Sequence, residues 1–158
     1  MTQHPHSMNS PAYEIVLPLD SPTTEETGTK REKWWQDIAR FSEWPAWLPA
    51  AKLIELTTSG EPGRGTGFNI ILQGALEHWR VSYWSPGYRA VFQISAPGYR
   101  GALALELLDA DSPMLQLRLT ADISYRGWRR GFTPLLRRRF QHRLSQFAVA
   151  LQTQLLQS

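Results

Sequence analysis

The sequence predicts an α+β protein in which an antiparallel β-sheet of about seven strands packs against one long C-terminal helix. Two patterns carry this prediction: hydrophobic residues alternate with a period of two between residues 51 and 125, and they recur at spacings of three and four from 134 to 156. The chain has 158 residues, 42% of them hydrophobic. That is enough for one domain with a substantial core.

The N-terminal third of the sequence predicts a disordered N-terminal segment (the lead), a strand and two helices. Residues 1–12 are polar, with two prolines and two histidines, so we expect a disordered lead before a single domain over residues 13–158. Alternation predicts a strand at 13–18, followed by a loop over 19–29. Helical spacing of Trp34, Trp35, Ile38 and Phe41 predicts a helix over 30–41. Pro45 then breaks this helix and starts a very short second one.

The middle of the chain predicts an antiparallel meander. The expected strands are 51–58, 66–73, 76–84, 89–96, 100–109 and 113–125. The gaps between them are short and rich in Gly and Pro, and two nearly identical turns, SPGYR at 85–89 and APGYR at 96–100, contain the Pro-Gly pair of a type II turn. Gaps this short join antiparallel neighbours. The strand at 113–125 has one apolar and one polar face, so one face of the sheet must be covered.

The C-terminal segment predicts the helix that covers the sheet. Thr133 is a suitable N-cap and Pro134 a suitable first helical residue. The apolar stripe then follows at helical spacing through Leu136, Phe140, Leu144, Phe147, Ala148, Leu151 and Leu155.

This order of elements resembles the helix-grip fold of the START-like (SRPBCC) superfamily, which includes plant pollen allergens, polyketide cyclases and lipid-transfer domains. Locally, the segment DIARFSEWPAWLP at 37–49 is similar to a family motif, as is the Gly/Pro loop GFTPL at 131–135. The resemblance covers residues 13–156. It implies a curved sheet wrapped around the long helix, two short helices between the first two strands, and a cavity that binds a hydrophobic or amphipathic molecule. It does not imply a reaction.

The candidate ligand-binding residues are the aromatic and helix-stripe side chains that would face this cavity. Trp79 and Tyr83 share one strand face, as predicted by the alternation, and Phe68 and Phe92 lie on the expected inner faces of their strands. These faces either line a cavity or fill the core completely. The full set is Trp44, Trp47, Phe68, Trp79, Tyr83, Phe92, Leu119, Arg137, Phe140, Arg143, Leu144 and Phe147.

Two arginines bear on whether the protein is a carrier or an enzyme. At 100° per residue Arg137 falls within the apolar stripe and Arg143 at its edge, whereas Arg138 and His142 point away. Each guanidinium could hold a ligand carboxylate or an enolate, or extend along apolar surface into water. We therefore expect a lipid-, isoprenoid- or polyketide-binding protein, with an aromatase/cyclase or dehydratase as the alternative; catalytic residues are not assigned.

Several classes are excluded or not expected. The chain has no Cys, which rules out disulfides, thiolate metal sites and a Cys nucleophile. No metal-ligand motif or cofactor loop is present, so we expect no metal and no cofactor. A membrane-spanning apolar run and a secretory signal are both lacking, and we expect a cytoplasmic protein. The pattern does not indicate an oligomeric state.

Charge is unevenly distributed along the chain. Residues 1–62 hold nine acidic and five basic residues, a net −4, and residues 63–158 hold five and twelve, a net +7. After Asp122 there is no acid, and seven arginines follow: Arg126, Arg129, Arg130, Arg137, Arg138, Arg139 and Arg143. This block is either a solvated helix face or a transient contact with a membrane surface. Nucleic acid is not an expected partner, because no recognised binding motif accompanies the arginines.

Overall fold

The computed structural model describes residues 13–19, 27–49, 51–109 and 115–157. The predicted N-terminal lead, residues 1–12, lies outside the described residues. The single domain over 13–158 stays a prediction.

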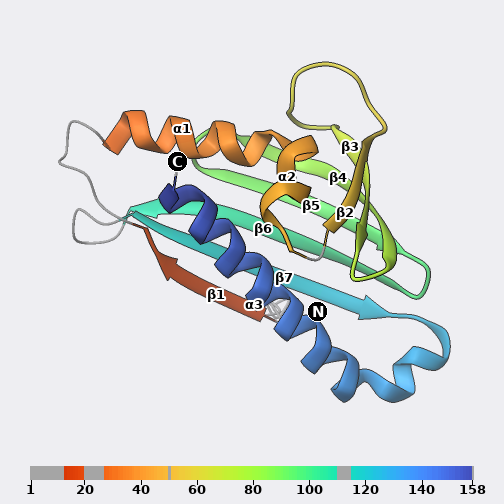
Figure 1. Ribbon diagram of the computed structural model, residues 1–158. Coiled ribbons are helices and arrows are strands. Elements are labelled where there is room, and N and C mark those ends of the chain that lie inside the picture. Colours follow the sequence, from red (N-terminus) through yellow and green to blue (C-terminus); the bar gives the residue numbers. More distant parts are fainter. Residues whose placement is uncertain (1–12, 20–26, 50, 110–114, 158) are drawn as a thin grey trace, which may run out of the picture.

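A curled antiparallel sheet forms the framework of the protein (Figure 1). Its strands are β1 (Tyr13–Pro18), β2 (Ala51–Leu56), β3 (Gly67–Leu72), β4 (Ala75–Ser85), β5 (Arg89–Ala96), β6 (Tyr99–Asp109) and β7 (Leu115–Tyr125). The seven strands lie in the order β1-β7-β6-β5-β4-β3-β2, and every neighbouring pair is antiparallel. The predicted meander is therefore confirmed, and β1 forms one edge of the sheet by pairing with β7.

The hairpin turns follow the expected chemistry. Gly87 and Gly98 have φ of 82° and 98°, as required at the third position of a Pro-Gly type II turn. Between β3 and β4, Gln73 and Gly74 have φ of 49° and 79°, the positive values of a type I′ hairpin turn. Gln73 is a non-glycine residue in the left-handed region, where a side chain is strained.

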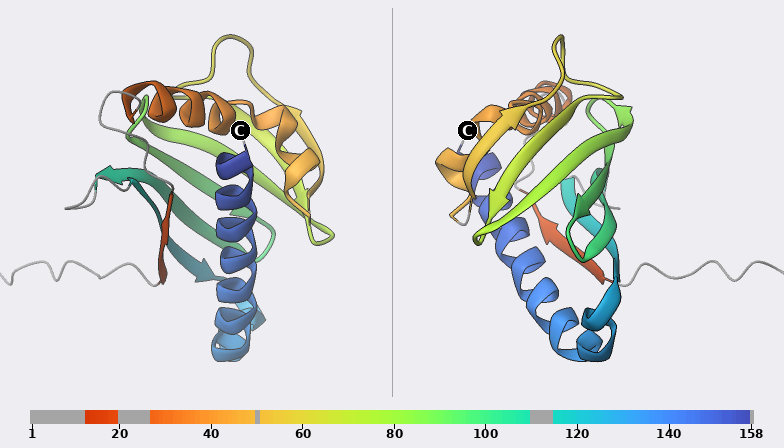
Figure 2. Two further views of the ribbon diagram at one scale, coloured as in Figure 1. Left: turned by 60° about the vertical axis from the view of Figure 1, so that its left-hand side comes forward. Right: turned by 90° about the vertical axis from the view of Figure 1, so that its right-hand side faces the viewer.

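Helices cover one face of the sheet (Figure 2). They are α1 (Thr27–Ala39), the 3₁₀ helix η1 (Phe41–Glu43), α2 (Trp44–Trp47), the 3₁₀ helix η2 (Gly127–Phe132) and α3 (Thr133–Gln157). The expected start of the first helix at 30 is wrong, since α1 begins at Thr27, inside the predicted loop. The long helix agrees with the expected 134–156 to within one residue at each end. The predicted helix-grip architecture is confirmed.

An aromatic cluster fills the space between α1, α2 and the middle of the sheet. Trp44 is fully buried, and its ring lies 5.6 Å from that of Phe68 and 5.9 Å from that of Phe92, both edge-on. Phe41 stacks on Phe68 with centroids 5.0 Å apart. The Trp44 indole N–H donates to the carbonyl of Ile38 at 3.0 Å, so burial leaves this donor satisfied.

Arg31 fastens α1 to the sheet. Its guanidinium donates to the carbonyl oxygens of Gly87 and Leu107, each at 3.0 Å, and forms an ion pair with Asp109. The guanidinium carbon also lies 4.7 Å from the centroid of the Tyr88 ring. A buried guanidinium needs such partners, and these hold α1 over the turn between β4 and β5.

Candidate functional site

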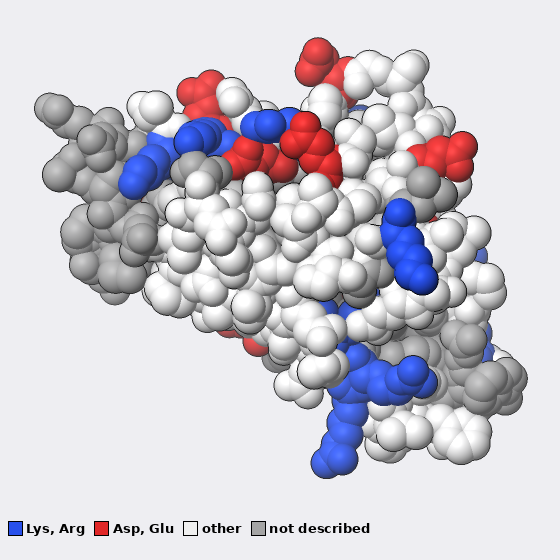
Figure 3. Space-filling model, in the orientation of Figure 1, with Lys and Arg blue, Asp and Glu red and all other residues white. Residues whose placement is uncertain are grey.

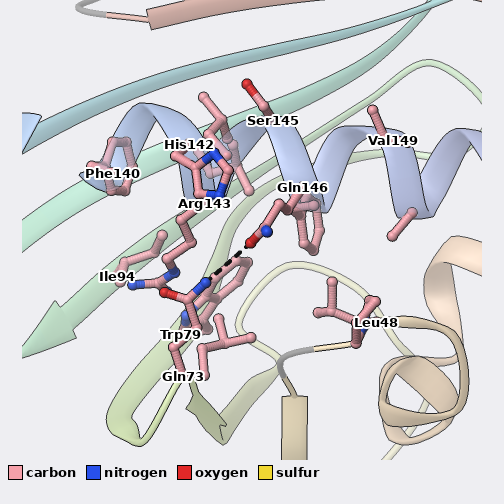
Figure 4. A pocket seen from close by; sticks show the side chains of 16 residues that line it. Leu48, Gln73, Trp79, Ile94, Phe140, His142, Arg143, Ser145, Gln146 and Val149 are labelled. Carbon is pink, nitrogen blue, oxygen red and sulfur yellow. Dashed lines mark hydrogen bonds between the residues drawn. The ribbon is translucent and has the colours of Figure 1, made fainter. Parts of the chain in front are cut away.

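A cavity of about 620 Å³ lies between α3 and the sheet. Its walls come from the end of β3, from β4, β5 and β6, from the segment after α2, and from the middle of α3 (Figure 4). Most of the wall is hydrophobic, with polar groups gathered on α3 and at the end of β3. The lining residues are Leu48, Pro49, Leu72, Gln73, Trp79, Ile94, Leu103, Phe140, His142, Arg143, Leu144, Ser145, Gln146, Phe147, Val149 and Ala150.

Five of the candidate ligand-binding residues line this cavity: Trp79, Phe140, Arg143, Leu144 and Phe147. Five others lie elsewhere in the core. Trp44, Phe68, Phe92 and Leu119 are fully buried, and the half-buried Trp47 packs against the rings of Trp44 and Phe147. The aromatic residues therefore do both things that the sequence left open: some line a cavity and others fill the core.

The expected inward orientation of Tyr83 is wrong. A β-bulge interrupts the pairing of β4 with β5 between Val81 and Tyr83. An extra residue at a bulge reverses the alternation beyond it, so Val81 is buried while Tyr83 is 50% exposed. Trp84 instead packs against the core, with its ring 4.9 Å from that of Trp35.

The expected position of Arg137 within the buried stripe is also wrong. Arg137 is exposed and does not line the cavity. The first turns of α3 extend to the edge of the molecule (Figure 2), where little of the sheet lies beneath them. The backbone carbonyl of Arg137 accepts a hydrogen bond from the Tyr13 hydroxyl at 3.3 Å. Helical phase alone therefore did not bury this residue.

Arg143 belongs to a buried polar cluster at the cavity wall, together with Glu77 and Tyr99. Its guanidinium forms an ion pair with Glu77, whose side chain is 1% exposed, and reaches the Tyr99 hydroxyl at 3.4 Å. The Tyr99 hydroxyl in turn donates to the second carboxylate oxygen of Glu77. The indole nitrogen of Trp79 lies 3.5 Å from Oε1 of Glu77, the oxygen that pairs with Arg143. Both oxygens of the buried carboxylate thus have donors.

The electrostatics of this cluster keep its charges paired. Burial, and then the neighbouring Glu77 carboxylate, raise the pKa of Tyr99 to about 12, so the phenol stays protonated and donates. Burial alone would lower the pKa of Arg143, but Glu77 and Tyr99 outweigh it and the pKa is raised. The cluster therefore holds one positive and one negative charge.

Neither Glu77 nor Tyr99 was predicted from the sequence as a site residue. A signal for Glu77 was present, because strict alternation places residue 77 on the same strand face as Trp79 and Val81. An acid on that face needs a cation opposite, and Arg143 at the edge of the helix stripe is that cation. The signal for Tyr99 was weaker, since its position lies at the start of β6, next to a turn.

Two glutamines meet across the rim of the cavity. The Gln73 side-chain amide donates to the side-chain carbonyl of Gln146 at 3.1 Å, joining the β3–β4 turn to α3 (Figure 4). Both side chains are exposed, as is His142, which also contributes to the lining. His142 was expected to point away from the stripe, and it lies at the rim.

A smaller hollow of about 150 Å³ adjoins the cavity. Leu72, Gln73, Phe140 and Arg143 line both spaces. Tyr99 lines the smaller one. The Arg143 side chain therefore lies between the two hollows, with Tyr99 on the far side.

In the described part of the chain, no group of three or more His, Asp or Glu side chains is placed to hold a metal ion. None of its helices is both long enough and apolar enough to cross a membrane.

The strand order and the position of α3 define a helix-grip fold, with a cavity between the sheet and the long helix. Solved structures share this fold. One is a START superfamily protein from Mycobacterium smegmatis, with a TM-score of 0.69 and 13% identity over 92% of this chain and 97% of that one. Another is the Zhui aromatase/cyclase from Streptomyces sp. R1128, with a TM-score of 0.71 and 14% identity over 90% and 92%. A third, Ara h 8.0201, has a TM-score of 0.60 and 13% identity over 92% and 97%.

These identities are low, so the likeness establishes the fold and not the ligand. No protein-family model matches the sequence. No curated protein matches it either.

Proposed function

We propose that residues 13–158 form a single cytoplasmic domain that binds a hydrophobic or amphipathic small molecule, such as a lipid, isoprenoid or polyketide, in the cavity beneath α3. The observation that carries this proposal is the cavity itself. Its volume of about 620 Å³ falls within the range of small-molecule sites, and a mainly apolar wall with a few polar groups is typical of them.

The first experiment is native mass spectrometry of the purified protein, followed by extraction of any bound compound. A copurified hydrophobic molecule supports the proposal and gives its chemical class. An apo mass is followed by thermal melts with added isoprenoid alcohols and fatty alcohols, because a ligand of the folded state raises the melting temperature. Failure of every compound to shift the melt, with an apo mass, contradicts the proposal.

A matched pair of variants on α3 tests whether the ligand binds in this cavity. Gln146 lies at the rim of the cavity, whereas Gln141 is exposed on the same helix and does not line it. Gln146→Trp places an indole at the rim and is expected to weaken binding about tenfold or more. Gln141→Trp is expected to bind like the parent protein. Equal behaviour of the two variants would place the ligand elsewhere.

An aromatase/cyclase or dehydratase is the second candidate function. It requires a polar head group in an otherwise apolar cavity, and Arg143 supplies one. An aldol cyclisation of a polyketide chain forms one carbon–carbon bond and then loses water, without an oxidant. A hydrogen bond from the guanidinium to the ketone oxygen would polarise the carbonyl group that is attacked. Incubation with a poly-β-ketone thioester tests this: a cyclic product that disappears in Arg143→Met supports catalysis.

The exposed arginines support a further proposal, transient contact with an anionic membrane surface. Arg126, Arg137, Arg138 and Arg139 are exposed, and basic side chains gather at the end of the molecule where α3 begins (Figure 3). Leu135, 59% exposed, lies among them. Guanidinium groups with an apolar side chain suit phospholipid headgroups.

Vesicle sedimentation tests the membrane contact. We expect binding to phosphatidylglycerol vesicles but not to phosphatidylcholine vesicles, and loss of binding when Arg137, Arg138 and Arg139 are changed to Gln. Binding to RNA in place of vesicles, with a steep dependence on salt, would overturn this part of the proposal.

A further inference from the structure

The buried cluster of Arg143, Glu77 and Tyr99 bears on which ligands the cavity accepts. Arg143 is an arginine in the wall of the main cavity, so a carboxylate ligand would be the simple expectation from that residue alone. The structure adds Glu77 directly behind it, 1% exposed and paired with the guanidinium. The cation that a carboxylate would need is therefore already neutralised from within the protein.

The guanidinium can still donate hydrogen bonds. Arginine has five N–H donors in a planar fork. Among the described residues, the guanidinium donates to Glu77 and to the Tyr99 hydroxyl. A ligand oxygen at the wall beside Arg143 can accept a hydrogen bond from one of the remaining N–H groups.

The charge of that ligand oxygen determines how favourable binding is. A carboxylate beside Arg143 would place a second negative charge near the buried Glu77, where water screens poorly. An alcohol or ketone oxygen accepts the same hydrogen bond without adding a charge. The other basic groups of the walls, Arg139 and His142, are exposed, where solvent weakens their attraction for an anion.

We propose that Glu77, by pairing with Arg143, makes the cavity select apolar ligands with a neutral oxygen, such as an alcohol or ketone, over the corresponding carboxylates. This inference rests on the proposed ligand-binding function and specifies its ligand class. Glu77 acts through Arg143 and is a positioning residue. Tyr99 completes the arrangement by donating to the second oxygen of the carboxylate, which holds Glu77 in place.

The test is displacement of the neutral fluorophore N-phenyl-1-naphthylamine by 1-dodecanol and by dodecanoate, at about pH 8, where a free carboxyl is ionised. The parent protein is expected to bind the alcohol at least about tenfold more tightly than the acid. Equal binding, or tighter binding of dodecanoate, overturns the inference and leaves the proposed function intact. If neither compound displaces the fluorophore, the proposed function fails as well.

The decisive variant is Glu77→Gln, because any apolar cavity disfavours a carboxylate to some extent. Without the Glu77 charge, Arg143 is free to pair with the ligand, so the preference for the alcohol is expected to fall about tenfold or reverse. The matched control is Glu55→Gln, which changes an exposed acid on β2. This variant is expected to keep the parent protein's preference for the alcohol. An unchanged preference in Glu77→Gln overturns the role of Glu77.

A second variant covers the case in which Glu77→Gln does not fold. Glu77→Leu combined with Arg143→Met replaces the whole ion pair by apolar side chains, a change that proteins often tolerate. This variant loses the donor, so it is expected to bind 1-dodecanol no better than dodecane, whereas the parent protein prefers the alcohol. The same preference in both proteins would show that Arg143 does not contact the ligand oxygen.

Discussion

The two ends of the concave face of the sheet are built differently. Beneath α1 and α2, Phe41, Trp44, Phe68 and Phe92 form a continuous cluster of rings with no exposed surface beyond 2%. Beneath the middle of α3, the same sheet leaves a cavity of about 620 Å³. Large rings thus fill one end of this face, and the other end keeps a hollow with Arg143 in its wall.

The largest expected effect comes from opening the packed end. Trp44→Ala removes a fully buried ring and is expected to lower the free energy of unfolding by about 3–5 kcal/mol. Trp47→Ala, at a half-buried position, is expected to lower the free energy of unfolding by clearly less. Urea unfolding followed by circular dichroism measures both. If the two variants are equally destabilised, the packed end does not dominate stability.

Larger side chains at the two ends test the difference between packed core and cavity. Ala90 is fully buried in β5, so Ala90→Leu overpacks the core and is expected to cost about 1–3 kcal/mol. Ala150 lines the cavity, and Ala150→Leu has room for its extra atoms. We expect a stability change below about 1 kcal/mol for Ala150→Leu, together with weaker ligand binding. A larger loss in Ala150→Leu than in Ala90→Leu would contradict the presence of a hollow.

Alkaline pH tests the polar cluster. In the folded protein, burial raises the pKa of Tyr99 from the ordinary tyrosine value of 10.0 to about 12. Above pH 10 the unfolded chain loses this proton first, so the stabilisation present below pH 10 is lost as the pH rises from 10 toward 12. Denaturant unfolding at several pH values measures the fall, and Tyr99→Phe should reduce it. A Tyr99→Phe protein with the parent's full pH dependence would contradict the assignment.

The smallest expected effect lies at the rim. Gln73 has φ of 49°, and Asn tolerates this conformation better, so Gln73→Asn is expected to raise the free energy of unfolding by about 0.5 kcal/mol. The shorter side chain also gives up the hydrogen bond to Gln146. Gln146→Ala, which loses this bond without altering the turn, is the control and should show no stabilisation. Thermal melts of the two variants check the prediction; a lower melting temperature for Gln73→Asn would refute it.

The fold was predictable because its signals are local. Alternation, Pro-Gly turns and a helical stripe follow directly from the geometry of strands and helices. The site was predictable only in part. Tyr83 was misplaced because a bulge in β4 reverses its side-chain direction. Arg137 was misplaced because little of the sheet lies beneath the first turns of α3, and helical periodicity does not report how far the sheet extends.

By itself the sequence determined the order of elements, the antiparallel meander and the apolar face of the C-terminal helix. The tertiary structure decided which aromatic rings pack together and which face a hollow, because that depends on how far the sheet curls away from α3. It also decided that Arg143 meets Glu77, 66 residues away. Such pairing depends on strand register and helix placement together, and neither is encoded in the periodicity of one segment.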